Sequence, residues 1–428
     1  MKELQVRIEI SGKSKLVGRL YYNSSLDAFF KYDSSYMADS QSAPISISLP
    51  FQDDPFTPLQ TKRFFEGLLP EGYTRKTVAE WLHVAENDYI SILHGLGNEC
   101  LGAIQIIDEY DQESSKYEEM TVDEAKKLAN EGATKSTEIL MTTHLSLAGA
   151  SGKVGLYLDS KNNKWYFPKG KAPSTHIVKQ SHIRLNGLVT NEQLCLLTAK
   201  KLGISVANSF IIDTGAKQDA DVLFASERYD RTFIGATKVV DGLLCPLRLH
   251  QEDFSQALGI PSSDKYEKQE QQYLKSMFDI IRSYSANPLS DMQELWKRIV
   301  FNYLIGNCDG HIKNNALLYS SDLKKIRLAP AYDIVSTVVY TTARKELSMA
   351  IAGEYDIERI DRSTFSRAAK EVTIGNSMAM KIFDDLCSGF TDALTASATV
   401  LKDQGYYNVD HIYEGILASG GIKNILSK

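Results

Sequence analysis

The chain has 428 residues, of which 43% are hydrophobic, 24% charged and 10% aromatic. This composition is typical of a globular protein and excludes a disordered, collagen-like or disulfide-stapled chain. The length predicts two or three domains. The net charge of −6, from 48 basic and 54 acidic residues, excludes a large basic field. We therefore do not expect the chain to bind DNA or RNA strongly by itself.

Cysteine spacing and the N-terminus indicate the compartment. The five cysteines, at positions 100, 195, 245, 308 and 387, form no C-x-x-C pair, which argues against a zinc ribbon or a redox site. The first residues, MKELQVRIEIS, lack the basic and apolar regions of a signal peptide. No apolar run reaches the roughly 18 residues of a membrane span. We expect a cytoplasmic protein with reduced thiols.

The first hundred residues are predicted to combine a small sheet with helices. Strand-like alternation covers Leu4–Ile10, Lys15–Tyr22, Pro44–Pro50 and Leu101–Ile107. Apolar residues three and four apart predict helices between Gln60 and Leu96. The next segment, 108–124, holds eight acids against one lysine and is predicted to be a solvated connection between domains.

Residues 143–249 return to strands and turns around one helix, and the chain after His250 is mainly helical. Its longest predicted helix starts at Ser290 as the N-cap, with Asp291 and Glu294 near its positive end. We predict an α+β protein. Its segments are a small N-terminal α/β subdomain (1–108), an acidic connection (109–142), a mixed-sheet lobe (143–249) and an all-helical C-terminal lobe (250–428).

The sharpest chemical signal is GNCDGHIKNNALLY, residues 306–319. Asp309 and Asn314 have the D-x-x-x-x-N spacing of a kinase catalytic loop. In that loop the aspartate lies beside the acceptor hydroxyl, and the asparagine holds a metal ion on the phosphates. Asp333, in the later string AYDIV, has the place of a second metal ligand. Oxygen ligands of this kind suit Mg²⁺.

Residues further upstream could hold nucleotide phosphates. Lys179 stands among apolar neighbours in a predicted strand, as does the lysine that pairs with the α and β phosphates of ATP, and Glu192 in the following helix could anchor it. Gly149 and Gly152 mark a turn before that strand. The string around Lys153 is no Walker A motif, because only two residues separate the glycines and a valine follows the lysine. A P-loop ATPase is disfavoured.

Each of these features also has an ordinary interpretation. A lone D-x-x-x-x-N match arises by chance, Lys179 alone is commonly a strand-edge lysine, and Glu192 alone is a first-turn acid. Two glycines usually mark a hairpin, and His311 is equally a structural loop residue. The order of the parts along the chain, from glycine turn to final acid, is that of a kinase and favours the catalytic interpretation.

At these residues the sequence resembles the HipA family of bacterial serine/threonine kinases, the toxin half of toxin–antitoxin pairs. The resemblance covers nearly the whole chain and rests on LSLAGASGK, STHIVKQS and GNCDGHIKNNALLY, with five further strings. These are FFEGLLPEG (64–72), GLGNECLGAIQI (95–106), SERYDR (226–231), RLHQEDFSQALG (248–259) and LAPAYDIVST (328–337). The resemblance implies a two-lobed, protein-kinase-like fold in which residues 143–249 form the ATP lobe.

The resemblance also implies roles for the site residues. The catalytic residue would be Asp309, and the Mg²⁺ ligands would be Asn314 and Asp333. The ATP-binding residues would be Ser151, Gly152, Lys153, Lys179, Glu227, Tyr229, Asp230 and His311. Of these, Lys179 would hold the α and β phosphates, and Glu227 and Tyr229 would lie beside adenine.

Ser146 corresponds to the serine that the family autophosphorylates. Its modification would add about two negative charges near the ATP phosphates and could switch the kinase off. The sequence departs from the family at Ser151 and Gly152, where a glutamine and an acid are common, and Ser151 is a second candidate phosphosite. As in the family, no D-F-G triplet surrounds Asp333.

The implied function is an ATP- and Mg²⁺-dependent protein serine/threonine kinase that acts as a growth-arresting toxin. Its target would be an aminoacyl-tRNA synthetase, the glutamyl enzyme first. Its partner would be a HipB-like helix-turn-helix antitoxin, which carries it to operator DNA and represses the operon with it. Two alternatives are a small-molecule kinase of similar fold and a catalytically degenerate corepressor module. The presence of every expected catalytic residue argues against the corepressor.

Overall fold

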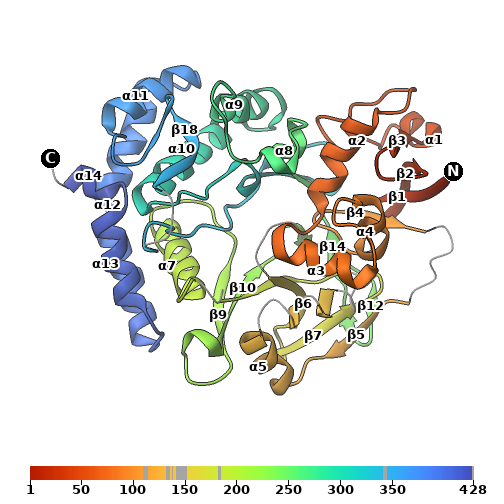
Figure 1. Cartoon of the computed structure of the whole chain (residues 1–428), viewed down its shortest axis with the longest axis horizontal. Helices are drawn as coiled ribbons and strands as arrows, with labels where there is room; N and C mark the ends of the chain where they lie inside the picture. The colour runs from red at the N-terminus through yellow and green to blue at the C-terminus, as the bar shows by residue number, and fades with distance from the viewer. Residues whose placement is uncertain are drawn as a thin grey trace. The chain divides into compact units, whose positions relative to one another are not determined.

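The structure is a computed structural model of the chain (Figure 1), and it describes residues 1–108, 114–131, 135–136, 138–140, 152–181, 185–340 and 345–426. Contacts divide the chain into two compact units. The first unit comprises residues 1–180, 225–262 and 317–326, and the second unit comprises 181–224, 263–316 and 327–428. The four segments expected from the sequence divide the chain by pattern instead of by contact, and they stay a prediction.

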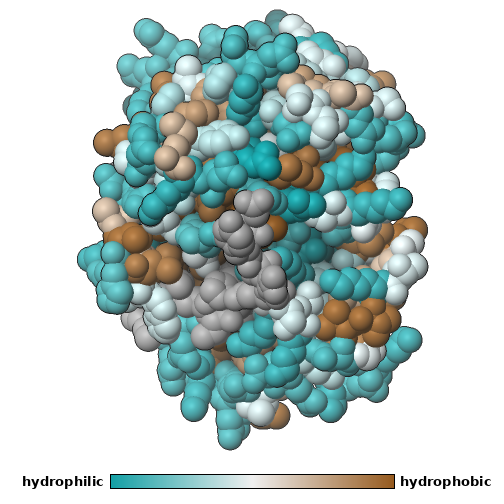
Figure 2. Space-filling model, turned by 90° about the vertical axis from the view of Figure 1, so that its right-hand side faces the viewer, coloured by the Kyte–Doolittle hydropathy of each residue, from teal (hydrophilic) through white to brown (hydrophobic). Residues whose placement is uncertain are grey.

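The surface drawn in Figure 2 is mainly hydrophilic, with small, separate hydrophobic areas. Scattered apolar residues of this kind are normal on a folded protein. No helix in the described ranges is both long and apolar enough to cross a membrane.

A four-stranded antiparallel sheet opens the first unit, with the strand order β3-β2-β1-β4. The strands are β1 (Lys2–Ile10), β2 (Lys13–Tyr22), β3 (Phe29–Tyr32) and β4 (Ile104–Ile107). In β1, Leu4, Val6 and Ile8 are buried and their neighbours are more exposed, because successive side chains of a strand point to opposite faces. The predicted strands at β1, β2 and β4 are confirmed.

The predicted strand at Pro44–Pro50 is wrong. Its residues form a turn closed by an isolated bridge between Ser46 and Leu49. The hydroxyl of Ser46 donates to Glu252 (2.5 Å), and the hydroxyl of Ser48 donates to a backbone carbonyl (2.7 Å). The alternating pattern therefore arises from serines that bond to the turn's surroundings, and no partner strand is involved.

Short helices connect β3 to β4. They are α1 (Ser34–Ala38), α2 (Pro58–Phe65), the 3₁₀ helix η1 (Glu66–Leu68), α3 (Gly72–Leu82) and α4 (Tyr89–Leu96). Helix α2 begins where it does because Thr57 and Gln60 form a capping box around Pro58 at the first helical position. The helices predicted between Gln60 and Leu96 are confirmed.

The second sheet of the first unit has the strand order β5-β7-β6-β8 and continues into β10. The strands are β5 (Lys116–Glu119), β6 (Lys153–Asp159), β7 (Lys164–Lys169), β8 (His176–Gln180) and β10 (Val222–Glu227), and helix α5 (Val122–Glu131) follows β5. The acidic stretch is thus more than a connection. Tyr117 turns inward between exposed charges and packs on Tyr157, with 4.5 Å between ring centroids, and this contact fixes β5 to the sheet.

Short elements complete the first unit, and the last of them passes into the second unit after Ile326. They are β11 (Arg231–Thr232), β12 (Val239–Val240), β13 (Leu243–Leu244), β14 (Leu247–Arg248), β15 (Gln251–Asp253), α8 (Phe254–Ala257), β16 (Ala316–Tyr319) and β17 (Ile326–Leu328). Strands β15, β16 and β17 form a three-stranded sheet. The register of β11 and β14 places Arg231 directly opposite Arg248, an arrangement of like charges that destabilises a strand pair unless acids lie nearby.

Helices make up most of the second unit. They are α7 (Leu188–Lys201), α9 (Tyr273–Tyr284), α10 (Pro288–Ile305), α11 (Arg362–Glu371), α12 (Asn376–Asp403), α13 (Val409–Ser419) and α14 (Ile422–Leu426), with the 3₁₀ helices η2 (Asp219–Asp221), η3 (Ser262–Asp264) and η4 (Ile312–Asn314). The long helix α12 packs against α7, α10 and α11. Phe365 of α11 lies between Trp296 of α10 and Phe383 of α12, with ring centroids 5.8 and 4.8 Å away.

The prediction of an all-helical C-terminal lobe is wrong in part. Residues 250–428 also contain β15, β16 and β17, and the hairpin β18 (Glu346–Ile351) and β19 (Glu354–Asp356); strand β9 (Ser209–Asp213) lies earlier in the second unit. Strands of only three to six residues give short runs that periodicity alone cannot distinguish from a buried helix segment. The mixed helix and sheet class is confirmed.

The predicted cap at Ser290 is also wrong. Helix α10 starts two residues earlier, at Pro288, with Asn287 as the N-cap residue, because proline suits the first helical position. Asp291 does lie in the first turn. Its carboxylate binds Arg327 (2.9 Å) and the backbone N–H of Leu328 (3.0 Å), so it holds strand β17 as well as favouring the helix end.

A buried ion-pair network stabilises the first unit. Glu99 accepts from Arg228 (3.1 Å), Arg231 (2.8 Å) and Arg248 (2.7 Å), and Asp230 accepts from Arg228 (2.7 Å) and Arg231 (3.0 Å). All five side chains are at most 7% exposed. Burial by itself raises the pKa of the Glu99 carboxyl, but the three guanidinium groups together outweigh burial and hold that pKa well below its ordinary value.

We expect Glu99→Ala to destabilise the protein by about 3–5 kcal/mol, because three buried guanidinium groups would lose their shared carboxylate. Chemical denaturation measures the loss. Glu119→Ala is the matched control, since Glu119 pairs with Lys164 at 2.9 Å but both side chains are about half exposed, and its effect should be far smaller. Equal losses in the two variants would contradict a stabilising network.

A second buried carboxyl, Glu252, behaves differently. It accepts from the hydroxyls of Ser46 (2.5 Å) and Tyr319 and from the backbone N–H of Ile47 (3.1 Å). Burial raises the pKa of Glu252 to about 7, and the hydrogen bonds only partly oppose this. The folded protein therefore keeps a proton on Glu252 at pH values where the unfolded chain has released it.

This difference predicts how stability depends on pH. Relative to Glu252→Gln, the wild type should lose stability as pH rises from about 4.5, the ordinary pKa, to about 7, and the difference should then level off. Thermal unfolding midpoints of both proteins across this range measure it. A wild type that gains stability over the variant with rising pH would show that Glu252 is buried as a carboxylate.

Candidate active site

A left-handed turn at the end of α10 starts the candidate active site. Gly306 follows the helix with a φ of +70°, a conformation that residues with a Cβ rarely adopt. Its carbonyl accepts from the backbone N–H groups of Thr337 (3.0 Å) and Val338 (3.3 Å). A Cβ at this position would lie 2.3 Å from a Val338 methyl carbon. Glycine therefore lets the chain after α10 lie close to the 329–338 segment.

The loop after this turn brings Asp309 and Asn314 together. The side-chain nitrogen of Asn314 donates to the Asp309 carbonyl (3.0 Å), and the Asp309 N–H donates to Asn307 Oδ1 (3.1 Å). The Asp309 side chain is exposed, and its Oδ1 accepts from the hydroxyl of Tyr266 (2.7 Å). An exposed carboxylate on a loop held by its own hydrogen bonds suits a group that must meet an acceptor hydroxyl.

Asp333 lies on the 329–338 segment, which is bonded to the same loop. The bonds run from the Ser336 hydroxyl to the Ile305 carbonyl (2.6 Å), from the Cys308 N–H to Thr337 Oγ1 (2.9 Å) and from the Tyr332 hydroxyl to the Lys313 carbonyl (2.8 Å). Asp333 has a φ of +56°, which aspartate tolerates better than most residues. The predicted metal ligands Asn314 and Asp333 thus belong to two strips of chain that hydrogen bonds join.

The donor atoms of these two residues suit Mg²⁺. The amide nitrogen of Asn314 already donates to the Asp309 carbonyl, which leaves the amide oxygen as the atom for a metal. The carboxylate of Asp333 supplies a second oxygen. Enzymes that act on phosphates hold Mg²⁺ through one or two protein oxygens together with phosphate oxygens and water. The residues fit the ion, and its binding stays a prediction.

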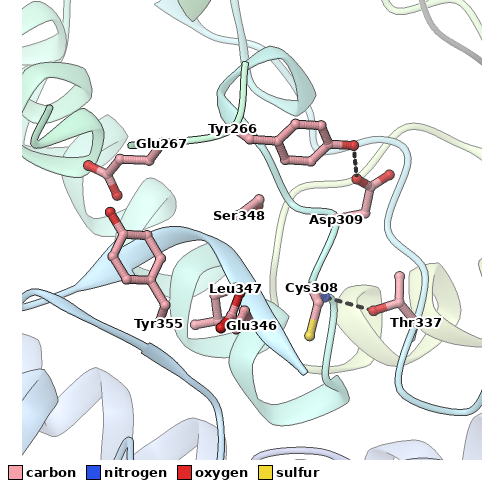
Figure 3. Close-up of a pocket in the computed structure, with 9 residues that line it drawn as sticks. All are labelled: Tyr266, Glu267, Cys308, Asp309, Thr337, Glu346, Leu347, Ser348 and Tyr355. Atoms are coloured by element: carbon pink, nitrogen blue, oxygen red, sulfur yellow. Dashed lines mark hydrogen bonds between the residues drawn. The ribbon is translucent and has the colours of Figure 1, made fainter. Parts of the chain in front are cut away.

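A cavity of about 540 Å³ lies beside Asp309 in the second unit. Its lining residues are Tyr266, Glu267, Cys308, Asp309, Thr337, Glu346, Leu347, Ser348 and Tyr355. Figure 3 shows the Tyr266 hydroxyl bonded to Asp309 on one side of the cavity, and Tyr355 pointing toward Glu267 on the other. The predicted catalytic aspartate therefore faces a space that can receive another molecule.

His311 is part of the same loop and is 6% exposed. Its N–H donates to the Asp309 carbonyl (2.7 Å), and its ring meets the Tyr266 ring edge-on, with 5.4 Å between centroids. These contacts give His311 a structural part in shaping the loop. A direct contact with the nucleotide stays a prediction.

In the first unit, two lysines predicted to bind ATP lie side by side. The register of β6 and β8 pairs Lys153 with Lys179 and Val154 with Val178. Directly opposite residues share a face of a sheet, so the two ammonium groups project from the same face, and the buried valines fix the register from the other face. Like charges at paired positions favour an anion near them. Gly152 directly precedes β6, and Ser146, Gly149 and Ser151 lie outside the described residues.

The SERYDR string has a different role for each of its predicted site residues. Glu227 is exposed at the end of β10, and the Tyr229 hydroxyl donates to Gln251. Asp230 is 2% exposed, and its carboxylate accepts from Arg228 and Arg231 and from the N–H of Gly102 (2.6 Å). The prediction that Asp230 contacts the cofactor needs correction, because arginines and backbone surround its oxygens. The sequence could not reveal this burial, since one partner of Asp230, the N–H of Gly102, lies 128 positions away in the chain.

Helix α7 contains one predicted residue and one that sequence reasoning missed. Glu192 is the fifth residue of the helix, beyond its first turn, and is 4% exposed; its pairing with Lys179 of the first unit stays a prediction. The neighbouring Asn191 accepts from the Ser336 N–H and donates to the Ser336 carbonyl, both at 2.9 Å. It thereby holds the Asp333 segment. The signal was an asparagine inside an apolar helix, where it needs buried partners.

The turn at Gly306 generates a prediction. We expect Gly306→Ala to cost about 2–4 kcal/mol of stability, from left-handed backbone strain and overlap with Val338. Gly353 is the matched control, because its φ of +77° is similar but no atom lies within 4 Å of an added Cβ, so alanine there should cost only the backbone strain, about 1 kcal/mol. Equal thermal destabilisation of both variants would rule out close approach as the constraint.

Comparison with known proteins agrees with this geometry. The model of the HipA N-terminal domain matches residues 8–107, and the model of the HipA-like C-terminal domain matches residues 145–394. The protein Y4mE of Sinorhizobium fredii is 30% identical over 405 residues, 92% of each chain. The serine/threonine-protein kinase toxin HipA of Shewanella oneidensis is 28% identical over 355 residues, 80% of this chain and 77% of that one.

A solved structure shares the fold. It is the HipA chain of a complex of HipA, HipB and operator DNA from the toxin–antitoxin system of Shewanella oneidensis MR-1. The TM-score is 0.80 at 23% identity, over 99% of this chain and 97% of that one. The two HipA domain models together match most of the chain, and the solved structure has the same overall fold. The chain belongs to the HipA family.

Proposed function

We propose that this chain is a protein serine/threonine kinase that uses ATP and Mg²⁺. The arrangement around Asp309 carries the proposal: its carboxylate is exposed and lines a cavity, and its backbone carbonyl accepts a hydrogen bond from Asn314 of the same loop. Phosphoryl transfer asks mainly for positioning and charge neutralisation, which such a loop can supply. A relative named as a serine/threonine-protein kinase toxin supports the same activity.

In this proposal Asp309 orients the acceptor hydroxyl and takes its proton as the oxygen attacks the γ-phosphorus of ATP, while the bond from that phosphorus to the β,γ-bridging oxygen breaks and ADP leaves. Asn314 and Asp333 hold Mg²⁺, which when bound neutralises charge on the β and γ phosphates. Lys153 and Lys179 bind phosphate oxygens from the sheet of the first unit, where their paired positions double the local positive charge.

The remaining predicted residues serve the nucleotide and its regulation. Glu227 and Tyr229 lie beside adenine, His311 contacts the nucleotide, and Ser151 and Gly152 contact it from the glycine turn. Autophosphorylation of Ser146 would add about two negative charges where the ATP phosphates bind. The repulsion would switch the kinase off.

We further propose that the kinase is the growth-arresting toxin of a toxin–antitoxin pair. Its substrate is an aminoacyl-tRNA synthetase, the glutamyl enzyme first, and its partner is a HipB-like antitoxin with which it represses its operon. A HipA chain of the same fold has been solved with HipB and operator DNA. The net charge of −6 agrees with DNA contact that comes mainly through the antitoxin. Such a system acts in the cytoplasm.

The first test measures phosphate on the protein itself. Phosphatase-treated wild type, incubated with ATP and Mg²⁺, should gain phosphate on Ser146, detected by intact and peptide mass spectrometry. Asp309→Ala should slow this by about 10²- to 10⁴-fold, because the acceptor proton loses its base. Purified glutamyl-tRNA synthetase, added as a second acceptor, should be phosphorylated by the wild type alone.

Asp392→Ala is the matched control, since it removes an exposed carboxylate of α12 outside the loop and should leave the rate unchanged. Equal rates for wild type and Asp309→Ala would remove Asp309 from the mechanism. Transfer to sugars or aminoglycosides, with none to any protein, would favour the small-molecule kinase. No transfer to any acceptor would favour the degenerate corepressor.

A further inference from the structure

We infer that Tyr266 positions Asp309, and that the cavity which both residues line receives the acceptor hydroxyl. The inference rests on the proposed kinase function, and every residue that carries it belongs to the second unit. Tyr266 lies 43 positions before Asp309 in the chain, on the segment between η3 and α9. Nothing in the spacing of the catalytic loop points to it.

The contact itself is a hydrogen bond from a neutral hydroxyl to a carboxylate. The Tyr266 hydroxyl donates to Asp309 Oδ1 over 2.7 Å, although the tyrosine is 48% exposed. A hydrogen bond to an ionised oxygen is about twice as strong as a neutral one. Water competes for an exposed pair, however, so the bond orients Asp309 only if the tyrosine is itself held in place.

The backbone beside Tyr266 is held in this way. The N–H of Glu267 donates to the Ser348 carbonyl (2.9 Å), while its carboxylate accepts from the N–H groups of Tyr273 (2.6 Å) and Ala350 (2.5 Å). These bonds tie the residue next to Tyr266 to both α9 and β18. Tyr355 of β19 also points toward the Glu267 carboxylate (Figure 3).

The ring of Tyr266 is constrained as well. It meets the buried ring of His311 edge-on, at 5.4 Å and 83°, and edge-to-face packing of this kind stabilises a ring direction. The backbone N–H of His311 in turn donates to the Asp309 carbonyl. Tyr266 therefore contacts the catalytic loop at two places, once through its hydroxyl and once through its ring.

A fixed Asp309 carboxylate has a consequence for the acceptor. A carboxylate offers about four lone-pair directions, so donation by Tyr266 to Oδ1 leaves acceptor capacity for another hydroxyl. The cavity beside it, about 540 Å³, is within the range that holds a small ligand or a few residues of a peptide. Holding the carboxylate in one rotamer reduces the motion that must be lost when the acceptor arrives.

The test compares self-phosphorylation by wild type, Tyr266→Phe and Tyr284→Phe over a range of ATP concentrations. Tyr266→Phe should lower the maximal rate about 10-fold and leave the half-saturating ATP concentration unchanged, because the tyrosine acts on the acceptor side. Tyr284 is the matched control, since it is 49% exposed at the end of α9 and does not line the cavity. Its variant should keep the wild-type rate.

A double variant separates positioning from a merely structural effect. In the Asp309→Ala background, Tyr266→Phe should cause no further loss, because its effect passes through Asp309. The inference would be overturned if the rate losses of the two single variants multiplied in the double variant. It would also be overturned if Tyr266→Phe were as fast as wild type or faster. A faster variant would mean that the tyrosine hydroxyl occupies the acceptor's place. These results leave the proposed kinase intact, whereas a wild type that transfers no phosphate overturns both.

Discussion

The arrangement of the catalytic-loop candidate in the second unit depends most on the backbone carbonyl of Gly306. It accepts from two successive N–H groups of the segment that carries Asp333, and it can do so only because the chain turns in a left-handed conformation directly after α10. Because of that turn, the chain leaves α10 and continues as the loop that contains Asp309 and Asn314. The same backbone bonds, together with those of the Ser336, Thr337 and Tyr332 side chains, join the strip that carries Asp333 to the loop that carries Asn314.

The first unit is stabilised by charge. Its predicted phosphate-binding lysines, Lys153 and Lys179, occupy paired positions of a sheet, where like charges repel each other. Three arginines are likewise crowded together, but Glu99 and Asp230 neutralise them within the fold. The contrast separates two uses of the same electrostatics. The arginines and their acids serve the fold, and we propose that the two lysines serve phosphate binding.

Sequence reasoning reached the features that are local along the chain. The D-x-x-x-x-N spacing placed Asp309 and Asn314 on one loop, because only four residues separate them in the chain. Alternation of apolar residues predicted the strands β1, β2 and β4. It failed where a side chain's role depends on distant partners. Asp230 is next to the adenine-binding candidates in sequence, yet it is buried with arginines, and Tyr266 and Asn191 carry no motif although each holds part of the site. The false strand at Pro44–Pro50 has the same cause, because its serines bond to residues 200 positions away.

The chain passes between the two units five times, after residues 180, 224, 262, 316 and 326. Neither unit is one uninterrupted stretch, and β10 and β16 each begin in the second unit and end in the first. Even the region matched by the N-terminal domain model contains Glu99, whose carboxylate forms ion pairs with three arginines beyond residue 225. A single recombination event within such a gene would therefore separate parts that have to change together. Exchange of one unit between relatives would require matching changes on both sides of each junction.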